Sequence, residues 1–252
     1  MRNVVVLAPM PLEMKAIIEA FALSPAAGRV THSEGPAVDD YTVPFTGRVG
    51  DSAVTAIHIG MGPRLTRKAL ISLLDESVPG HVHVDHVMNS GICGGLDPDL
   101  EVGTLINPAI LVDHSSGKEY RHRPPVDEPL AGKLITTEVP TLDIELSKSF
   151  FANGCIAVDM ESAAVAEVCE SRGVPFSIYR CIGDRYVDGL LDERVLKLSN
   201  PDGSGNTEAL KKLLEEEPEV VANLERLSRE TSNAARLAAE ATVRGCLALD
   251  AL

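Results

Sequence analysis

Residues 155–185, CIAVDMESAAVAEVCESRGVPFSIYRCIGDR, decide how we expect this chain to fold. The stretch opens with the apolar run Cys155–Val158 and continues with apolar residues at helical spacing. Gly173 and Pro175 then favour a helix end. The β-branched and aromatic run Phe176–Ile182 predicts a buried strand. A strand, helix and strand in this order are typical of a mostly parallel sheet covered by helices.

Two carboxylates lie at the ends of elements in this unit. Glu161 follows the first predicted strand, and Asp184 lies just past the end of the second. In open sheets of this class, sites form beside the carboxyl ends of strands, so we expect both side chains at one site. A purely structural interpretation stays open for each residue. Glu161 suits a helix N-terminus, and Asp184 suits a turn or a cap.

The N-terminal segment supplies a third carboxylate at a strand end. Val4–Ala8 predicts the first buried strand, and Leu12–Phe21 predicts a helix with Glu13 in its first turn. An acidic residue at that place is favoured by the helix dipole alone. Its position directly after a strand nevertheless makes Glu13 a candidate site residue.

Two glycine-bearing segments are predicted to be turns after strands. Gly60–Pro63 joins the second strand of a hairpin to an amphipathic helix, and such a junction can cradle an anion on backbone N–H groups. Ser90–Leu96 follows a core strand that ends near Asn89, and its three glycines would let the backbone approach a ligand closely.

The remaining segments predict surface structure and covering helices. Residues 24–40 predict an irregular surface segment, and residues 207–249 predict helices that cover the sheet. Residues 115–133 predict a solvated loop or a subunit contact rather than a metal site, because their His spacing matches no standard ligand pattern. Residues 185–206 predict a long loop that could act as a lid. No repeat or linker divides the chain, so we expect residues 1–252 to form one domain.

Composition limits the partners and the compartment. The 252 residues include 23 Lys and Arg against 37 Asp and Glu, a net charge of −14, which argues against nucleic acid or an anionic membrane as a partner. The first residues lack the features of a signal peptide, and no apolar run approaches the roughly 20 residues of a membrane span. The five cysteines are scattered, so we expect buried free thiols in a reducing cytoplasm.

Three motifs resemble the purine nucleoside phosphorylase and nucleosidase superfamily, in particular its methylthioadenosine/S-adenosylhomocysteine nucleosidase branch. AVDMESAAVAEVCESRGVPFSIYRCIGDR (157–185) resembles the Met-Glu and Ser-Asp motifs, NSGICGGLDPDLEVGTLI (89–106) the Gly-rich turn, and APMPLEMKAI (8–17) the N-terminal segment. The resemblance implies an α/β fold: a three-layer α/β/α sandwich with a mixed, partly barrel-like central sheet. It also implies a homodimer that cleaves the N-glycosidic bond of a small-molecule nucleoside.

The resemblance implies roles for individual residues. Asp184 would protonate the leaving purine, and Glu13 would activate the attacking water. Glu161 would bind the ribose hydroxyls and Met160 would pack on the ribose, while Arg180 would support the site. The remaining implied contacts come from the Gly-rich segment and a base-stacking position: Gly91, Ile92, Cys93, Gly94 and Val139. Neither a cofactor nor a metal is required.

The chemistry of the reaction agrees with these roles. A glycosidic bond breaks through an oxocarbenium-like state in which the base leaves with the bonding electrons. A carboxylic acid whose pKa is raised by burial can neutralise that base. A carboxylate beside the sugar stabilises the positive ring and binds hydroxyls through charge-assisted hydrogen bonds.

The nucleophile is predicted to be water rather than phosphate. In the family's phosphorylases the Gly-rich turn carries Arg and Ser for phosphate, where this chain has Asn89 and Ile92, and their Gly-Asp-Pro loop is replaced by APMPLE. We therefore expect a purine nucleosidase that acts on a 5′-modified adenosine. Phosphorolysis stays open because Arg48, Arg64 and Arg67 could bind phosphate. A non-catalytic nucleoside-binding protein stays open too.

Three positions depart from the nucleosidases that the chain resembles and leave the exact substrate open. Those proteins usually have Ser where Ile92 stands, Ser where Gly183 stands, and a purine-stacking Phe near Val139. The combination of VDMESAAVA with GGLDP is also similar to phosphorylase-like nucleosidases of hopanoid biosynthesis, so an unusual 5′ substituent is one alternative.

Overall fold

The computed structural model describes residues 1–26, 43–77, 81–125, 129–200 and 203–251. The strands are β1 (Arg2–Ala8), β2 (Ser24–Pro25), β3 (Phe45–Val49), β4 (Ser52–His58), β5 (His86–Gly95), β6 (Leu105–Ile106), β7 (Ile110–Asp113), β8 (Glu119–Arg121), β9 (Lys133–Thr136), β10 (Cys155–Asp159) and β11 (Phe176–Arg185). The α-helices are α1 (Pro11–Phe21), α2 (Pro63–Leu73), α3 (Ile144–Ala152), α4 (Ser162–Arg172), α5 (Glu193–Leu196), α6 (Thr207–Glu216) and α7 (Val221–Ala248). Most of the predicted segment 24–40 lies outside the described residues.

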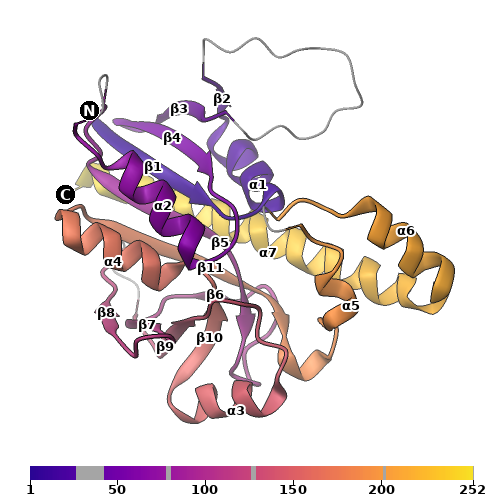
Figure 1. The fold of residues 1–252 in the computed structure, drawn as a ribbon. Coiled ribbons are helices and arrows are strands. Elements are labelled where there is room, and N and C mark those ends of the chain that lie inside the picture. The colour runs from indigo at the N-terminus through magenta and orange to yellow at the C-terminus, as the bar shows by residue number, and fades with distance from the viewer. Residues whose placement is uncertain (27–42, 78–80, 126–128, 201–202, 252) are drawn as a thin grey trace.

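The strands form one mixed sheet that bends at β5 (Figure 1). The path runs β2-β3-β4-β1-β5-β10-β9-β7-β8, and β11 pairs with β5 and β6 off this path. One edge of β5 pairs with parallel β11, while the other edge pairs first with β1 and then, at Gly94 and Gly95, with β10. Within the described residues this path does not close, so the expected mixed sheet is confirmed as an open one.

The predicted order of β10, α4 and β11 is confirmed, but their expected parallel arrangement is wrong. β10 runs antiparallel to β5, whereas β11 runs parallel to β5. The long central strand offers both of its edges, so the two strands that flank α4 pair with it from opposite sides. Sequence periodicity identifies strands but carries no information about which edge each will join.

The Gly-rich segment is a strand rather than a turn. β5 continues through Ser90 to Gly95, and β11 likewise extends through Asp184 to Arg185. The predictions of a turn at 90–96 and of Asp184 beyond a strand end are therefore wrong. Gly91, Gly94 and Gly95 do not have positive φ angles. They serve the close approach of neighbouring side chains rather than a change of chain direction.

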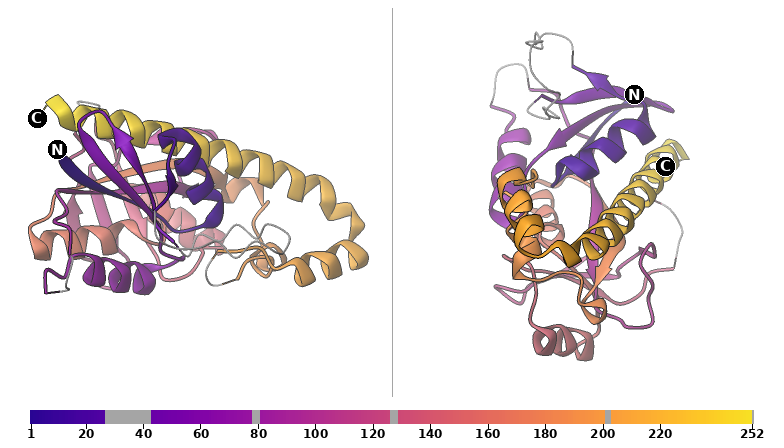
Figure 2. Two further views of the ribbon diagram at one scale, coloured as in Figure 1. Left: turned by 90° about the horizontal axis from the view of Figure 1, so that it is seen from above. Right: turned by 90° about the vertical axis from the view of Figure 1, so that its right-hand side faces the viewer.

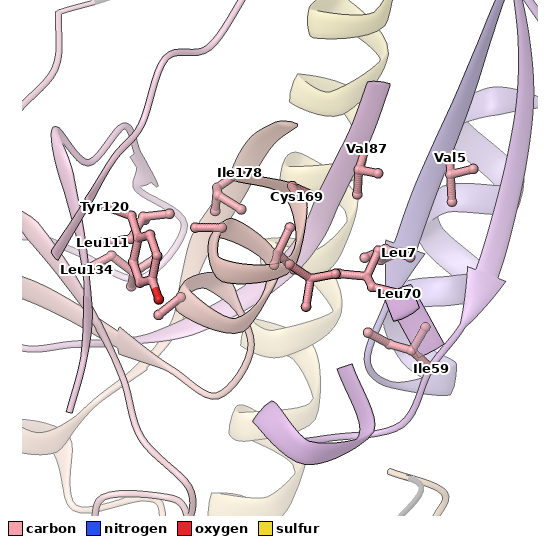
Figure 3. Packing of buried hydrophobic residues seen from close by; sticks show 14 of the residues in the cluster. Val5, Leu7, Ile59, Leu70, Val87, Leu111, Tyr120, Leu134, Cys169 and Ile178 are labelled. Atoms are coloured by element: carbon pink, nitrogen blue, oxygen red, sulfur yellow. The ribbon is translucent and has the colours of Figure 1, made fainter. Parts of the chain in front are cut away.

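Helices cover both faces of the sheet, which confirms the three-layer arrangement (Figure 2). Along β1 the side chains alternate between two cores. Val5 and Leu7 pack in the cluster on the side of α2 and α4, shown in Figure 3. Val4 and Val6 pack in the cluster on the side of α1 and α7. The α6 helix and the first turns of α7 extend beyond the sheet (Figures 1 and 2).

Two segments predicted to be loops contain ordered structure. Residues 185–206 include a 3-10 turn (Tyr186–Asp188), helix α5 and a bridge between Ser199 and Gly205, with 201–202 outside the described residues. Residues 115–133 include β8 and the buried His122, so the expected solvated loop is wrong there. The five cysteines are free and buried, as predicted. In the described part of the chain, no helix has the length and apolarity to cross a membrane.

Candidate active site

Arg180 on β11 lies at the centre of a buried cluster of charges. Its Nε donates to Asp159 Oδ2 at 3.0 Å, and its Nη2 donates to Glu161 Oε2 at 2.7 Å. Its Nη1 lies 3.5 Å from Glu13 Oε1. The Arg180 side chain is completely buried. One guanidinium therefore faces three carboxyl groups, which come from α1, the end of β10 and the residue before α4.

Glu13 has both a structural role and a place in the cluster. Met10 N–H donates to its Oε2 at 2.8 Å, which is half of a capping box at the start of α1. Its Oε1 accepts from Ile92 N–H of β5, also at 2.8 Å. Burial raises the pKa of the Glu13 carboxyl to about 7, while Arg180 lowers it and Glu161 raises it. This group can therefore gain or lose a proton near neutral pH.

Gly91 gives Glu13 and Arg180 the space that they occupy. A Cβ at Gly91 would lie 2.1 Å from Glu13 Oε1 and 2.4 Å from Arg180 Nη1. Neither group could remain in place beside a side chain at position 91. At Gly91 the groups that come close are protein side chains, and the approach of a ligand to the glycines of this segment stays a prediction.

Glu161 does not act as a helix cap. No capping hydrogen bond forms from its side chain, although it is the residue before α4. Its Oε1 accepts from Gly62 N–H at 2.8 Å, so the Gly-Met-Gly segment holds a carboxylate of the protein itself. Burial raises the pKa of Glu161, and Arg180 opposes that rise. With one oxygen on Gly62 and the other on Arg180, the orientation of this carboxylate is fixed.

Asp159 is a member of the cluster that the sequence prediction missed. Its Oδ1 accepts from Thr136 Oγ1 at 2.7 Å, and its Oδ2 accepts from Ser162 N–H at 3.1 Å. Asp159 thus stabilises the start of α4 and also binds Arg180. A signal existed in the sequence, because Asp159 is an acidic residue at a predicted strand end, two positions before Glu161.

Asp184 is a carboxyl group without a hydrogen-bond donor among the described residues. Its Oδ2 lies 3.8 Å from the place that a Cβ on Gly94 would take. Burial raises the pKa of Asp184 to about 6, and the charges of Asp188 and Glu230 raise it further. A carboxyl group in this environment is partly protonated near neutral pH and has its proton available to a ligand.

The other predicted contact residues include Met160, Val139 and Cys93. Met160 Cε lies 3.7 Å from the Cβ position of Gly62, so the Met160 side chain borders Glu161. The Val139 side chain is 68% exposed, and its carbonyl accepts from Thr137 Oγ1. Stacking of Val139 on a base remains a prediction. Cys93 is buried with a raised pKa, so its thiol stays protonated.

No group of three or more His, Cys, Asp or Glu side chains in the described ranges is arranged to hold a metal ion. Two histidines of the described residues are buried, and hydrogen bonds in the core account for both. His122 Nε2 accepts from Ile178 N–H at 3.0 Å, and its Nδ1 lies 3.0 Å from the carbonyl oxygen of Pro108. His86 Nε2 lies 2.7 Å from Ser177 Oγ.

Comparison with known proteins places the chain in a family. Residues 3–135 and 130–231 match the family described as the phosphorylase superfamily. A 5′-methylthioadenosine/S-adenosylhomocysteine nucleosidase of Anoxybacillus flavithermus is 26% identical over 170 residues, which are 56% of this chain and 71% of that protein.

Solved structures share the fold at lower identity. The Helicobacter pylori 5′-methylthioadenosine/S-adenosylhomocysteine nucleosidase with butyl-thio-DADMe-Immucillin-A superposes with a TM-score of 0.67 at 18% identity, covering 100% of this chain and 99% of that chain. The futalosine hydrolase of H. pylori strain 26695 superposes with a TM-score of 0.66 at 17% identity, covering 100% and 98%. The family match over most of its length shows that this chain belongs to the phosphorylase superfamily.

Proposed function

We propose that the protein is a purine nucleosidase that hydrolyses the N-glycosidic bond of a 5′-modified adenosine, such as methylthioadenosine or S-adenosylhomocysteine. The observation that carries the proposal is the buried Arg180 among three carboxyl groups beside Gly91 of β5, together with Asp184, which faces Gly94 of the same strand and accepts from no donor among the described residues. Its nucleosidase relatives at 26% identity support adenine as the base and a sulfur-bearing 5′ group.

Asp184 supplies the proton for the leaving base. A purine leaves more readily when a ring nitrogen accepts a proton as the glycosidic bond breaks. Burial keeps part of the Asp184 population protonated near neutral pH, and no described residue competes for that proton. Glu161 serves the sugar. Its fixed carboxylate accepts hydrogen bonds from ribose hydroxyls, and its negative charge stabilises the positive ring.

Glu13 and Arg180 hold the attacking water. Arg180 Nη1 is buried and has no hydrogen-bond partner among the described residues. It lies 3.5 Å from Glu13 Oε1, too close for a water molecule between the two atoms, so a water that accepts from Nη1 and donates to the carboxylate would lie beside this pair. Glu13 then takes the proton of that water as it attacks the sugar.

Phosphate fits this cluster poorly. The charge of Arg180 is already met by Asp159, Glu161 and Glu13, so a phosphate dianion would add repulsion. Arg67 forms ion pairs with Glu167 at 2.7 Å and with Asp113 at 3.4 Å. Both points favour hydrolysis over the alternative of a nucleoside phosphorylase.

Product analysis tests the proposal. Purified protein is incubated with methylthioadenosine, S-adenosylhomocysteine, adenosine and inosine, with and without phosphate, and free base is quantified by chromatography. We expect adenine from the 5′-modified substrates at a rate independent of phosphate. Asp184→Asn should lower kcat at least about 100-fold. Asp99→Asn, a change at an exposed aspartate, serves as the matched control.

Two results would reject the hydrolase. Release of ribose 1-phosphate that depends on phosphate would identify a phosphorylase. Nucleosides that raise the melting temperature without any release of base would identify a binding protein. We also expect a homodimer, and light scattering during size-exclusion chromatography measures its mass.

A further inference from the structure

We propose that Ile92 and Gly183 form one positioning unit, in which the Ile92 side chain holds the strand bulge that aims Asp184 while the Ile92 backbone holds Glu13. The inference rests on the proposed function for the roles of the two carboxyl groups. One contact between β5 and β11, that of Ile92 with Gly183, then sets where the acid Asp184 lies relative to the base Glu13.

The first observation is an irregularity in β11 immediately before Asp184. Pairing with β5 proceeds residue by residue to Ile182 opposite Cys93 and resumes with Asp184 opposite Gly94. Gly183 is therefore the extra residue of a β-bulge. In a regular strand Asp184 would share a face with Ile182, which is fully buried in the apolar core. The bulge shifts the alternation by one residue and turns Asp184 away from that core.

The second observation is what occupies the space beside the bulge. A Cβ on Gly183 would lie 3.2 Å from both Cβ and Cδ1 of Ile92 and 3.5 Å from Thr231 Cγ2 of α7. The φ angle of Gly183 is not in the left-handed region, so its backbone conformation does not require glycine. A side chain at position 183 would instead crowd Ile92, which fills the space beside the bulge. Ile92 also packs against the small buried cluster of β11 and α7.

The third observation links this contact to Glu13. Ile92 N–H donates to Glu13 Oε1 at 2.8 Å, so the residue whose side chain supports the bulge also orients the other carboxyl group. A group inserted at position 183 must displace Ile92 by a few tenths of an ångström. That displacement changes the position of the Asp184 carboxyl group directly. It also changes the position of the Glu13 carboxyl group, through the N–H group of Ile92.

A double-mutant cycle at positions 183 and 92 tests the unit. One substitution adds a methyl group, and the other removes most of the side chain that this methyl group meets. Gly183→Ala adds one methyl group against Ile92, and we expect kcat to fall about tenfold or more with a change in KM of less than about threefold. In the Ile92→Ala background the contact with Cδ1 at 3.2 Å is gone, while those with the Cβ of residue 92 at 3.2 Å and with Thr231 Cγ2 at 3.5 Å remain, so the relief is partial. The double variant should therefore have at least about three times the kcat of Gly183→Ala alone. Gly205→Ala is the matched control, because its Cβ would meet no atom of the described residues within 4 Å and its φ angle is not left-handed.

A titration that needs no substrate separates this inference from the proposed function. The carboxyl carbon of Asp184 is followed by NMR across pH 4–8 in the wild type, in Gly183→Ala and in the double variant. We expect the apparent pKa to change in the single variant and to return toward the wild-type value in the double variant. If Gly183→Ala does not fold, Ile92→Val, which keeps the branched Cβ, is compared with Ile92→Ala. Only the alanine variant should shift the titration.

Three outcomes would overturn the positioning unit. The first is an unchanged kcat and an unchanged titration in folded Gly183→Ala. The second is the same loss of kcat whether residue 92 is Ile or Ala. The third is equal titration of Asp184 in Ile92→Val and Ile92→Ala. A wild-type protein that releases no base would reject the proposed function instead, and the titration would still decide on the unit.

Discussion

The dependence of kcat/KM on pH should be bell-shaped, with a maximum near pH 6.5. The proposed reaction requires Glu13 to be ionised, so that it accepts a proton from water, and Asp184 to be protonated, so that it donates one to the base. Burial raises the pKa of Glu13 to about 7 and that of Asp184 to about 6. The group that must be ionised thus has the higher pKa, and only a minor protonation state of the free protein is active.

The size of the effect follows from these two values. At pH 6.5, midway between them, about a quarter of Glu13 is ionised and about a quarter of Asp184 is protonated, so roughly 6% of the protein is in the active state. At pH 8.5 Asp184 is protonated in only ~0.3% of molecules, and at pH 4.5 Glu13 is ionised in a similar fraction. From Glu13 and Asp184 alone we expect kcat/KM to fall about 20-fold from its maximum at either pH, and protonation of Glu161, whose pKa burial also raises, deepens the fall on the acidic side.

The assay measures initial rates of adenine release at low substrate concentration between pH 4.5 and 8.5, at constant ionic strength. Melting temperatures across the same range show where the protein stays folded. The residual kcat/KM of Glu13→Gln should no longer fall at acidic pH through protonation of residue 13. A rate that stays constant from pH 5.5 to pH 8, or that rises steadily into the alkaline range, would refute the reasoning. Either result would mean that no carboxylic acid with a raised pKa limits the reaction.

Three substitutions test the surroundings of the site. Arg180→Met leaves its carboxylate partners buried without a cation, so urea unfolding should show a loss of about 3–5 kcal/mol at pH 8 and less at pH 5, where carboxyl groups can protonate. An equal loss at both pH values would contradict this. Gly91→Ala places a methyl group on Glu13 and should lower kcat about 100-fold or more, and near-normal kcat would show that the cluster adapts. Burial lowers the pKa of His122 to about 4, against 6.5 in the unfolded chain, so the stability supplied by its neutral form is complete above pH 6.5 and is lost as the pH falls toward 4. His122→Gln should reduce this loss of unfolding free energy between pH 6.5 and pH 4 by up to ~3 kcal/mol in urea titrations. An unchanged pH dependence would show that another group causes it.

Local sequence patterns predicted the elements that carry the site, although β11 continues through Asp184 instead of ending before it. Glu13, Glu161 and Asp184 were expected together from strand ends alone, and Arg180 from the family resemblance. Two of these carboxylates and Arg180 meet in one buried cluster, with Asp184 beside them. The predictions that were wrong depend on contacts between residues that are distant in sequence. The glycines of β5 suggested a turn, because no local pattern records that a carboxylate and a guanidinium from other elements fill the space beside them.

Two of these acidic residues stabilise the fold and also belong to the site. Glu13 caps α1 and reaches β5, and Asp159 starts α4 while it binds Arg180. Hydrogen bonds that begin two helices therefore also fix two of the three carboxyl groups around one guanidinium, and Gly62 N–H holds the third, so the cluster is rigid wherever the fold is formed. Asp184 has no such donor among the described residues and depends on strand geometry alone for its direction. A group that must give its proton to a departing base is best left without a competing acceptor or donor. Control of its direction then falls to the packing of Ile92 against the bulge.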